Sequence, residues 1–241
     1  MTEWWTYRPS DFLLFSARTY YRLFELYNAD AWPGHLLALG LALVLWLALL
    51  QGRAWAPRAA CALLAVAWLW VAWAFHGQRY AAINWAATWF AAAFAVQGLL
   101  LLSCTLVREP GERIAVRQGP ARSLGLALLL FALVVQPTLG VLLGRPWQQA
   151  EVFGLAPDPT ALGTLGVLLL RPARTPNGPA APRRPALAWR LWPIPLLWCA
   201  VTGMTLATMQ AADALLMPAA ALLAVVVGVS ARPATVNDGQ R

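Results

Sequence analysis

The sequence predicts an all-α fold, a polytopic bundle of transmembrane helices. Of the 241 residues, 60% are hydrophobic and only 12% are charged, with a mean hydropathy of +0.58. Several runs of about 20 residues also contain no charge, which is typical of membrane-spanning helices. About seven such runs with short connections use nearly the whole chain and leave no room for a soluble catalytic domain. Any function is therefore expected in the bundle or at its rims.

The apolar runs define about seven expected spans (six to seven). The last two are separated by a polar turn at residues 210–213 and are together too long for one crossing of about 20 residues, so we count seven. Before them, residues 1–32 are expected to form an extracytoplasmic amphipathic segment without a cleavable signal sequence. The expected spans are residues 33–51, 59–76, 83–107, 123–144, 152–170, 191–209 and 213–230.

The placement of arginine predicts the orientation of the chain. All 18 basic residues are arginines, and 13 of them fall on one face under the seven-span topology. The positive-inside rule makes this face cytoplasmic, with the N-terminus outside and the C-terminus in the cytoplasm. The net charge of +8 then predicts anionic lipid headgroups as partners. Nucleic acid is not expected, because the arginines lie on span-connecting loops without interleaved aromatic residues.

Residues 171–190 divide the bundle. They contain five prolines and five arginines but no acid, which is typical of an extended linker. On one side lies a five-span bundle, residues 33–170, with a broken fifth helix. On the other lie a two-span hairpin, residues 191–230, and a cytoplasmic tail, residues 231–241. A membrane protein partner would dock through this linker together with the amphipathic N-terminal segment.

The segment before the first span predicts an amphipathic helix. Ser16 is suited to cap its N-terminus. Tyr20, Leu23, Phe24 and Tyr27 then recur at helical spacing and form one apolar face. We expect this helix to lie on the outer leaflet. It serves either as a surface anchor or as a lid over an outward-facing cavity.

Two stretches of the chain resemble a known family. The opening W-W-T-Y-R-P-S-D-F-L-L-F-S, followed by R-T-Y-Y-R-L-F-E-L-Y-N, resembles the N-terminus of an uncharacterised family of bacterial multi-pass proteins. The segment F-G-L-A-P-D-P-T, residues 153–160, resembles a second element of that family. The resemblance implies a location in the bacterial inner membrane, and it implies no activity or substrate.

Two polar sites lie deep in expected spans. Gln136 and Pro137 fall near the middle of the fourth span, and Asp158, Pro159 and Thr160 fall at a similar depth in the fifth. Proline frees backbone carbonyls, which at membrane depth need protein or water as partners. We expect Asp158 to cap a short helix that starts at Pro159 and runs to residue 170. Such a broken helix builds binding sites in transporters, and the alternative is a purely architectural carboxylate.

Further candidates lie at the outer ends of the spans. Acidic, basic and amide side chains together would coordinate a cation or hold a polar solute, whereas the alternative for each of them is ordinary solvation at the interface. The binding candidates at this rim are His76, Arg79, Asn84, Glu151 and Asp213.

Enzyme signatures are missing from the sequence. We find no H-E-x-x-H, G-x-S-x-G or Walker motif, and two histidines cannot supply the four axial ligands of a two-haem cytochrome. We therefore expect no catalytic residue, no metal and no cofactor. The sequence predicts an uncharacterised integral inner-membrane protein that binds or passes a small solute or ion at an outward-facing site. The alternative is a non-catalytic structural or accessory subunit of a membrane complex.

Overall fold

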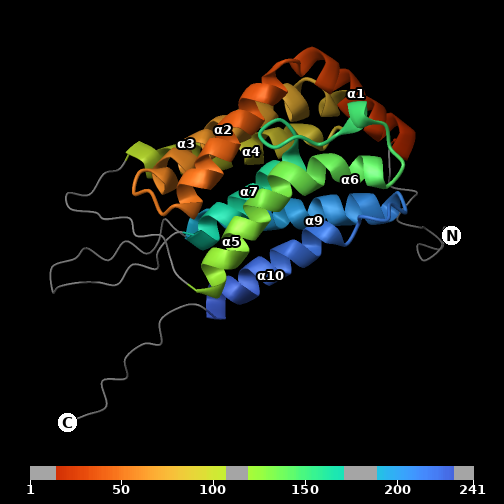
Figure 1. Cartoon of the computed structure of the whole chain (residues 1–241). Helices are drawn as coiled ribbons and strands as arrows, with labels where there is room; N and C mark the ends of the chain where they lie inside the picture. The colour runs from red at the N-terminus through yellow and green to blue at the C-terminus, as the bar shows by residue number, and fades with distance from the viewer. Residues whose placement is uncertain (1–14, 107–118, 171–188, 231–241) are drawn as a thin grey trace, which may run out of the picture.

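The computed structural model describes residues 15–106, 119–170 and 189–230, and within these ranges the chain is helical without strands. Figure 1 shows the helices. The α-helices are α1 (Ala17–Ala31), α2 (Gly34–Leu50), α3 (Ala56–Trp70), α4 (Ala87–Leu106), α5 (Pro120–Leu130), α6 (Gln136–Leu142), α7 (Pro157–Leu170), α9 (Pro193–Thr208) and α10 (Leu216–Ser230). Shorter π and 3-10 elements are η3 (Val71–Gly77), η4 (Tyr80–Ala82), η5 (Phe131–Val135) and η6 (Trp147–Gln149).

The predicted all-α class is confirmed, and each of the seven expected apolar segments contains a helix. By length and composition, three helical runs qualify as membrane spans: Ala56–Ala82, Ala87–Leu106 and Pro120–Leu142. The pair α1 and α2 qualifies as a fourth if it is counted as one bent span. Helices α9 and α10 are apolar but shorter, and α7 has 14 residues.

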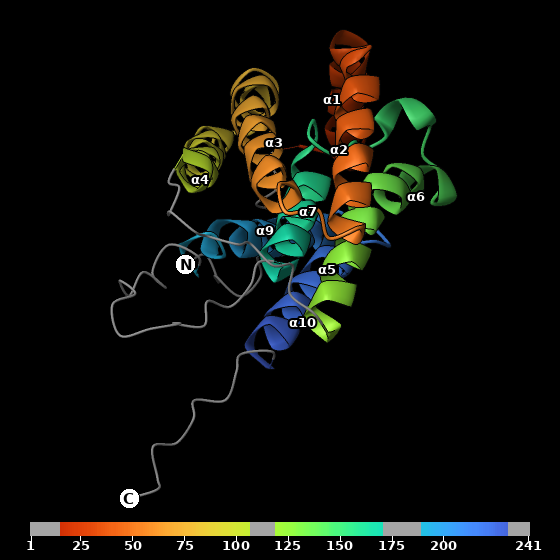
Figure 2. The same cartoon turned by 60° about the vertical axis from the view of Figure 1, so that its left-hand side comes forward.

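Helix α7 lies at the centre of the bundle. It runs between α2 and α3 on one side and α5 and α10 on the other (Figures 1 and 2), and every one of its 14 residues is buried. Its contact with α5 is close because Gly166 faces Gly125, where an added Cβ would lie 2.7 Å from the opposite carbonyl oxygen. A helix that is apolar on nearly all sides is stable only when neighbours surround it.

A π-helical segment interrupts each of the two longest helical runs, Ala56–Ala82 and Pro120–Leu142. Element η5 ends at Val135, two residues before Pro137, which lacks an amide hydrogen and whose ring displaces the carbonyl four residues earlier, at Leu133. Element η3 contains His76. Single π turns occur often beside functional residues, and here each one adjoins a buried polar side chain, Gln136 or His76.

Helix α1 has the predicted cap and apolar face. The Ser16 hydroxyl accepts a hydrogen bond from the Thr19 amide at 3.1 Å, and the four residues expected on the apolar face are all buried. The chain bends by 88° between α1 and α2, so that α1 lies across the end of the bundle where α6 and α9 finish (Figure 1).

Candidate functional site

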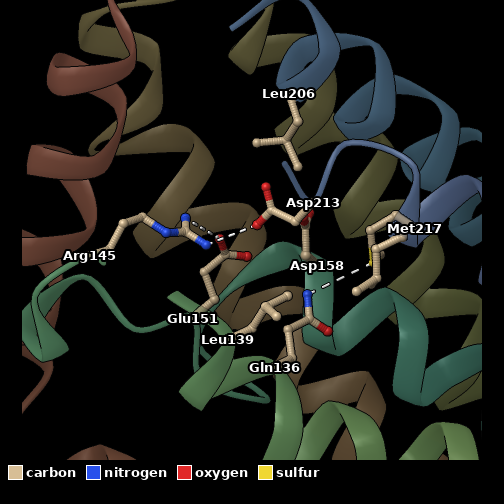
Figure 3. Close-up of a pocket in the computed structure, with 9 residues that line it drawn as sticks. Gln136, Leu139, Arg145, Glu151, Asp158, Leu206, Asp213 and Met217 are labelled. Atoms are coloured by element: carbon tan, nitrogen blue, oxygen red, sulfur yellow. Dashed lines mark hydrogen bonds and ion pairs between the residues drawn. The ribbon is translucent and has the colours of Figure 1, made fainter. Parts of the chain in front are cut away.

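A small cavity opens between the ends of α6, α7, α9 and α10, on the side of the bundle where α1 lies. Its volume is about 20 Å³, which is room for roughly one water molecule. We call it the carboxylate pocket, because three of its side chains are acids (Figure 3). Its lining consists of Gln136, Leu139, Arg145, Glu151, Asp158, Leu206, Asp213, Leu216 and Met217.

Arg145 is the basic member of the pocket. Its Nη2 donates to Asp213 Oδ2 at 2.9 Å, and its Nη1 lies 3.8 Å from Glu151 Oε1. The guanidinium also lies over the Tyr21 ring of α1, with Cζ 4.3 Å from the centroid. Since only 15% of the side chain is exposed, Arg145 is a nearly buried cation between two acids and an aromatic face.

The local sequence explains why Arg145 points into the pocket. Helix α6 ends in a Schellman turn, with Gly144 at φ +82° and the Arg145 amide donating to the Gly140 carbonyl at 2.8 Å. Pro146 follows and prevents the helix from continuing. A Cβ on Gly140 would lie 3.2 Å from the Arg145 Nε, so the missing side chain at this position makes room for the guanidinium.

Asp158 binds to α9, contrary to our expectation of a helix cap. Helix α7 begins at Pro157, so Asp158 lies in its first turn and Pro159 follows inside the helix. The two carboxylate oxygens accept hydrogen bonds from Trp198 Nε1 at 2.7 Å and from Thr202 Oγ1 at 2.9 Å. Trp198 and Thr202 are four residues apart and share one face of α9. The prediction of a cap was wrong because these donors come from a helix distant in sequence.

Several polar atoms of the pocket are buried without a hydrogen bond to the described residues. The Gln136 Nε2 donates weakly to Met217 Sδ at 3.8 Å, whereas its Oε1 is buried without a hydrogen bond. The Asp213 Oδ1 and the Arg145 Nη1 are likewise buried without one. Buried polar atoms of this kind normally bind water or a ligand.

The charges in the pocket do not balance. Three acids, Glu151, Asp158 and Asp213, share the pocket with one arginine, so full ionisation would leave two uncompensated negative charges in a buried site. Burial raises the pKa of Glu151 well above its usual range, and the charges of Asp158 and Asp213 raise it further, against the lowering effect of Arg145. The site therefore favours uptake of positive charge.

Helix α1 covers the loop that carries Glu151. The Tyr27 hydroxyl donates to the Leu155 carbonyl at 3.1 Å. The Asn28 side-chain amide donates to the carbonyls of Gln148 and Ala150, both at 2.8 Å. These contacts join α1 to residues 148–155.

The structure brings four of the ten candidate residues together in the pocket: Gln136, Glu151, Asp158 and Asp213. Pro137 and Pro159 are buried within the adjoining helices. Thr160 bonds within its own segment, because its hydroxyl donates to the Ala156 carbonyl at 2.7 Å and accepts from the Gly154 amide at 3.0 Å.

The other three candidates lie outside the pocket. His76 is fully buried among aromatic rings, the nearest being Phe94 at 4.4 Å between centroids. Arg79 pairs with Asp30 at 2.6 Å. Asn84 accepts a hydrogen bond from the Ala86 amide at 3.0 Å and so stabilises a turn.

Sequence reasoning missed Arg145, Trp198 and Thr202. Arg145 was one of the five arginines on the predicted outer face. The signal that could have identified it is its position between Gly144 and Pro146, a pattern typical of a helix end. The spacing of Trp198 and Thr202 in the sequence does not indicate that both donate hydrogen bonds to Asp158. Among the described residues, no group of three or more His, Cys, Asp or Glu side chains is arranged to hold a metal ion.

Comparison with known proteins adds a family. No curated protein and no solved structure matches the chain. The model of a family described as "Family of unknown function (DUF6064)" matches residues 17–236. This match includes the R-T-Y-Y-R-L-F-E-L-Y-N and F-G-L-A-P-D-P-T segments and nearly all of the described helices. The chain therefore belongs to the DUF6064 family of unknown function.

Proposed function

We propose that this protein is a multi-pass protein of a bacterial inner membrane and that it takes up a small ion at the carboxylate pocket from the outer side. The proposed topology has seven passes, with the N-terminus outside and the C-terminus in the cytoplasm. The large apolar side chains exposed on α2 support a lipid-facing surface. Leu36, Leu37 and Val44 are 58–67% exposed, a contiguous apolar surface that a soluble monomer rarely shows.

The observation that carries the proposal is the set of three acids and one arginine around a cavity of about 20 Å³. Uncompensated buried charge is costly, so such a site gains stability when it takes up a positive charge. The cavity is far smaller than the roughly 300 Å³ of a typical pocket for a small organic molecule. Within the predicted class of a small solute or ion, the geometry therefore favours an ion.

Ion uptake into proteoliposomes tests the proposal. Vesicles containing the wild-type protein, loaded with a pH-sensitive dye, are assayed for acidification and for entry of radiolabelled sodium. We expect uptake of one of the two ions, protons or sodium, to exceed the uptake by empty vesicles. Asp158→Asn should reduce this uptake at least tenfold. Asp30→Asn is the matched control, because Asp30 is an exposed acid outside the pocket with 66% of its side chain accessible. Equal uptake in wild type and Asp158→Asn, with both proteins folded, would rule the proposal out.

The hydrogen bonds of Asp158 favour a second candidate, an architectural or accessory role. They join α7 to α9, which is what an architectural carboxylate does. In that case Asp158→Asn lowers the melting temperature and leaves uptake unchanged. The predicted docking linker falls largely on residues 171–188, which lie outside the described residues. A partner that co-purifies with the full chain and is lost on deletion of residues 173–188 would support this role.

A further inference from the structure

Three polar side-chain atoms that line the carboxylate pocket are buried without a hydrogen bond: Gln136 Oε1, Asp213 Oδ1 and Arg145 Nη1. Figure 3 shows the Arg145 guanidinium beside the Asp213 carboxylate, whereas the Gln136 amide lies apart from both, with its Nε2 directed at Met217. The cavity of about 20 Å³ has room for about one water molecule.

Glu151 differs from the other two acids in its hydrogen bonds. Asp158 accepts from Trp198 and Thr202, and Asp213 accepts from Arg145 at 2.9 Å. Within the described ranges, no group donates a hydrogen bond to the Glu151 carboxylate, whose contact with Arg145 is the longer one at 3.8 Å. Glu151 is therefore the acid with the least support for its negative charge.

We propose that the ion is a proton and that the Glu151 carboxylate holds it. This inference rests on the proposed function, since it names the ion for the same site. A hydronium ion that reaches the cavity transfers one proton to a carboxylate oxygen of Glu151. The products are a neutral carboxylic acid and one water molecule.

The groups around Glu151 determine how this step depends on pH. Asp158 of α7 and Asp213 before α10 disfavour its negative charge, and Arg145 favours it. From α1, Tyr20 and Tyr21 also face it. Both tyrosines are neutral near pH 7, so the two acids and Arg145 decide the balance. Removing the charge of Asp158 should therefore move the protonation of Glu151 to lower pH.

Infrared difference spectroscopy on the purified full-length protein tests the site of protonation. Spectra recorded across a pH series should show the C=O stretch of a protonated carboxylic acid, and this band should be absent in Glu151→Gln. In Asp158→Asn the band should remain and titrate at lower pH. The matched control Asp30→Asn should give the wild-type band. A band that persists in Glu151→Gln, or no band in the wild type, overturns the proposal.

Parallel flux data separate this inference from the proposed function. Sodium uptake that depends on Asp158, without a carboxylic acid band, would retain the ion site and reject the proton. A Glu151 band without any flux would retain the proton site and reject transport.

Discussion

Asp158 and Glu151 carry the same charge in the same pocket, yet their surroundings assign them different roles. Asp158 accepts two hydrogen bonds from α9 and thereby holds two helices together. Glu151 lies on a loop with one long contact to Arg145. Burial disfavours the charge of a carboxylate, and hydrogen-bond donors offset part of this cost. Asp158 has two such donors, whereas Glu151 has none among the described residues.

The raised pKa of Glu151 predicts a pH dependence of stability. A raised pKa means that the folded protein keeps a proton at pH values where the unfolded chain has lost it. The contribution of Glu151 to stability is therefore fully present below its unfolded pKa and is lost as the pH rises through the folded pKa. Glu151→Gln stays neutral, so its melting temperature relative to wild type should increase with pH over that window. Thermal unfolding in detergent measures this, with Asp30→Asn as control, and parallel curves for wild type and Glu151→Gln would contradict it.

Individual residues show what the sequence can predict about the site. Gln136 and Asp158 were expected at a similar depth because of their positions along the fourth and fifth expected spans, and they do line one pocket. Arg145 counted only as one of the five arginines outside the predicted cytoplasmic face, since a sequence does not show that a helix end directs its side chain inward. The cap expected at Asp158 failed for a related reason, because a local pattern has no information about Trp198 and Thr202, which follow 40 and 44 residues later.

At the level of elements, the sequence predicts where the helices lie along the chain, but it does not predict which helices pack against each other. Apolar periodicity and a serine cap were enough to predict α1 and its buried face. The contact between α5 and α7 depends on two glycines whose alignment appears only in three dimensions. Gly125 and Gly166 let the two backbones approach until each glycine lies against the carbonyl of the other.

Gly166→Ala should weaken this contact. The new Cβ would lie 2.7 Å from the Gly125 carbonyl oxygen, which is backbone and cannot rotate away. We expect a loss of about 1–3 kcal/mol in the free energy of unfolding, typical of overpacking. Gly40→Ala in α2 is the control, because no heavy atom lies within 4 Å of its Cβ position. Chemical unfolding in mixed micelles measures both, and equal stabilities would show that the helices move apart without cost.

For the whole molecule, the central question is which end of the bundle faces outward. The carboxylate pocket, α1 and residues 144–156 share one end, and the turn at residues 51–55 lies at the other, where α2 finishes and α3 begins (Figure 1). The arginine distribution predicts that the first end is outside. The direction of ion uptake depends on this assignment.

Cysteine labelling checks the orientation. Trp147→Cys and Arg53→Cys place single exposed thiols at the two ends, since Trp147 is 60% exposed and Arg53 lies in an exposed turn. In intact cells an impermeant maleimide should label position 147 at least fivefold more than position 53, and permeabilisation should equalise the two. Native Cys61 and Cys199 are buried and should contribute little background. Labelling of both positions from outside would refute the seven-pass topology.

The central position of α7 has a consequence for biosynthesis. The ribosome makes this helix before α9 and α10, which supply part of its surroundings, including both donors to Asp158. Until those last helices emerge, a nascent chain has an unpaired acid and two prolines in a helix without its final neighbours. In the proposed seven-pass topology, insertion of α7 is therefore completed late in translation. A messenger truncated before codon 190 should yield a product that membrane quality-control proteases remove quickly.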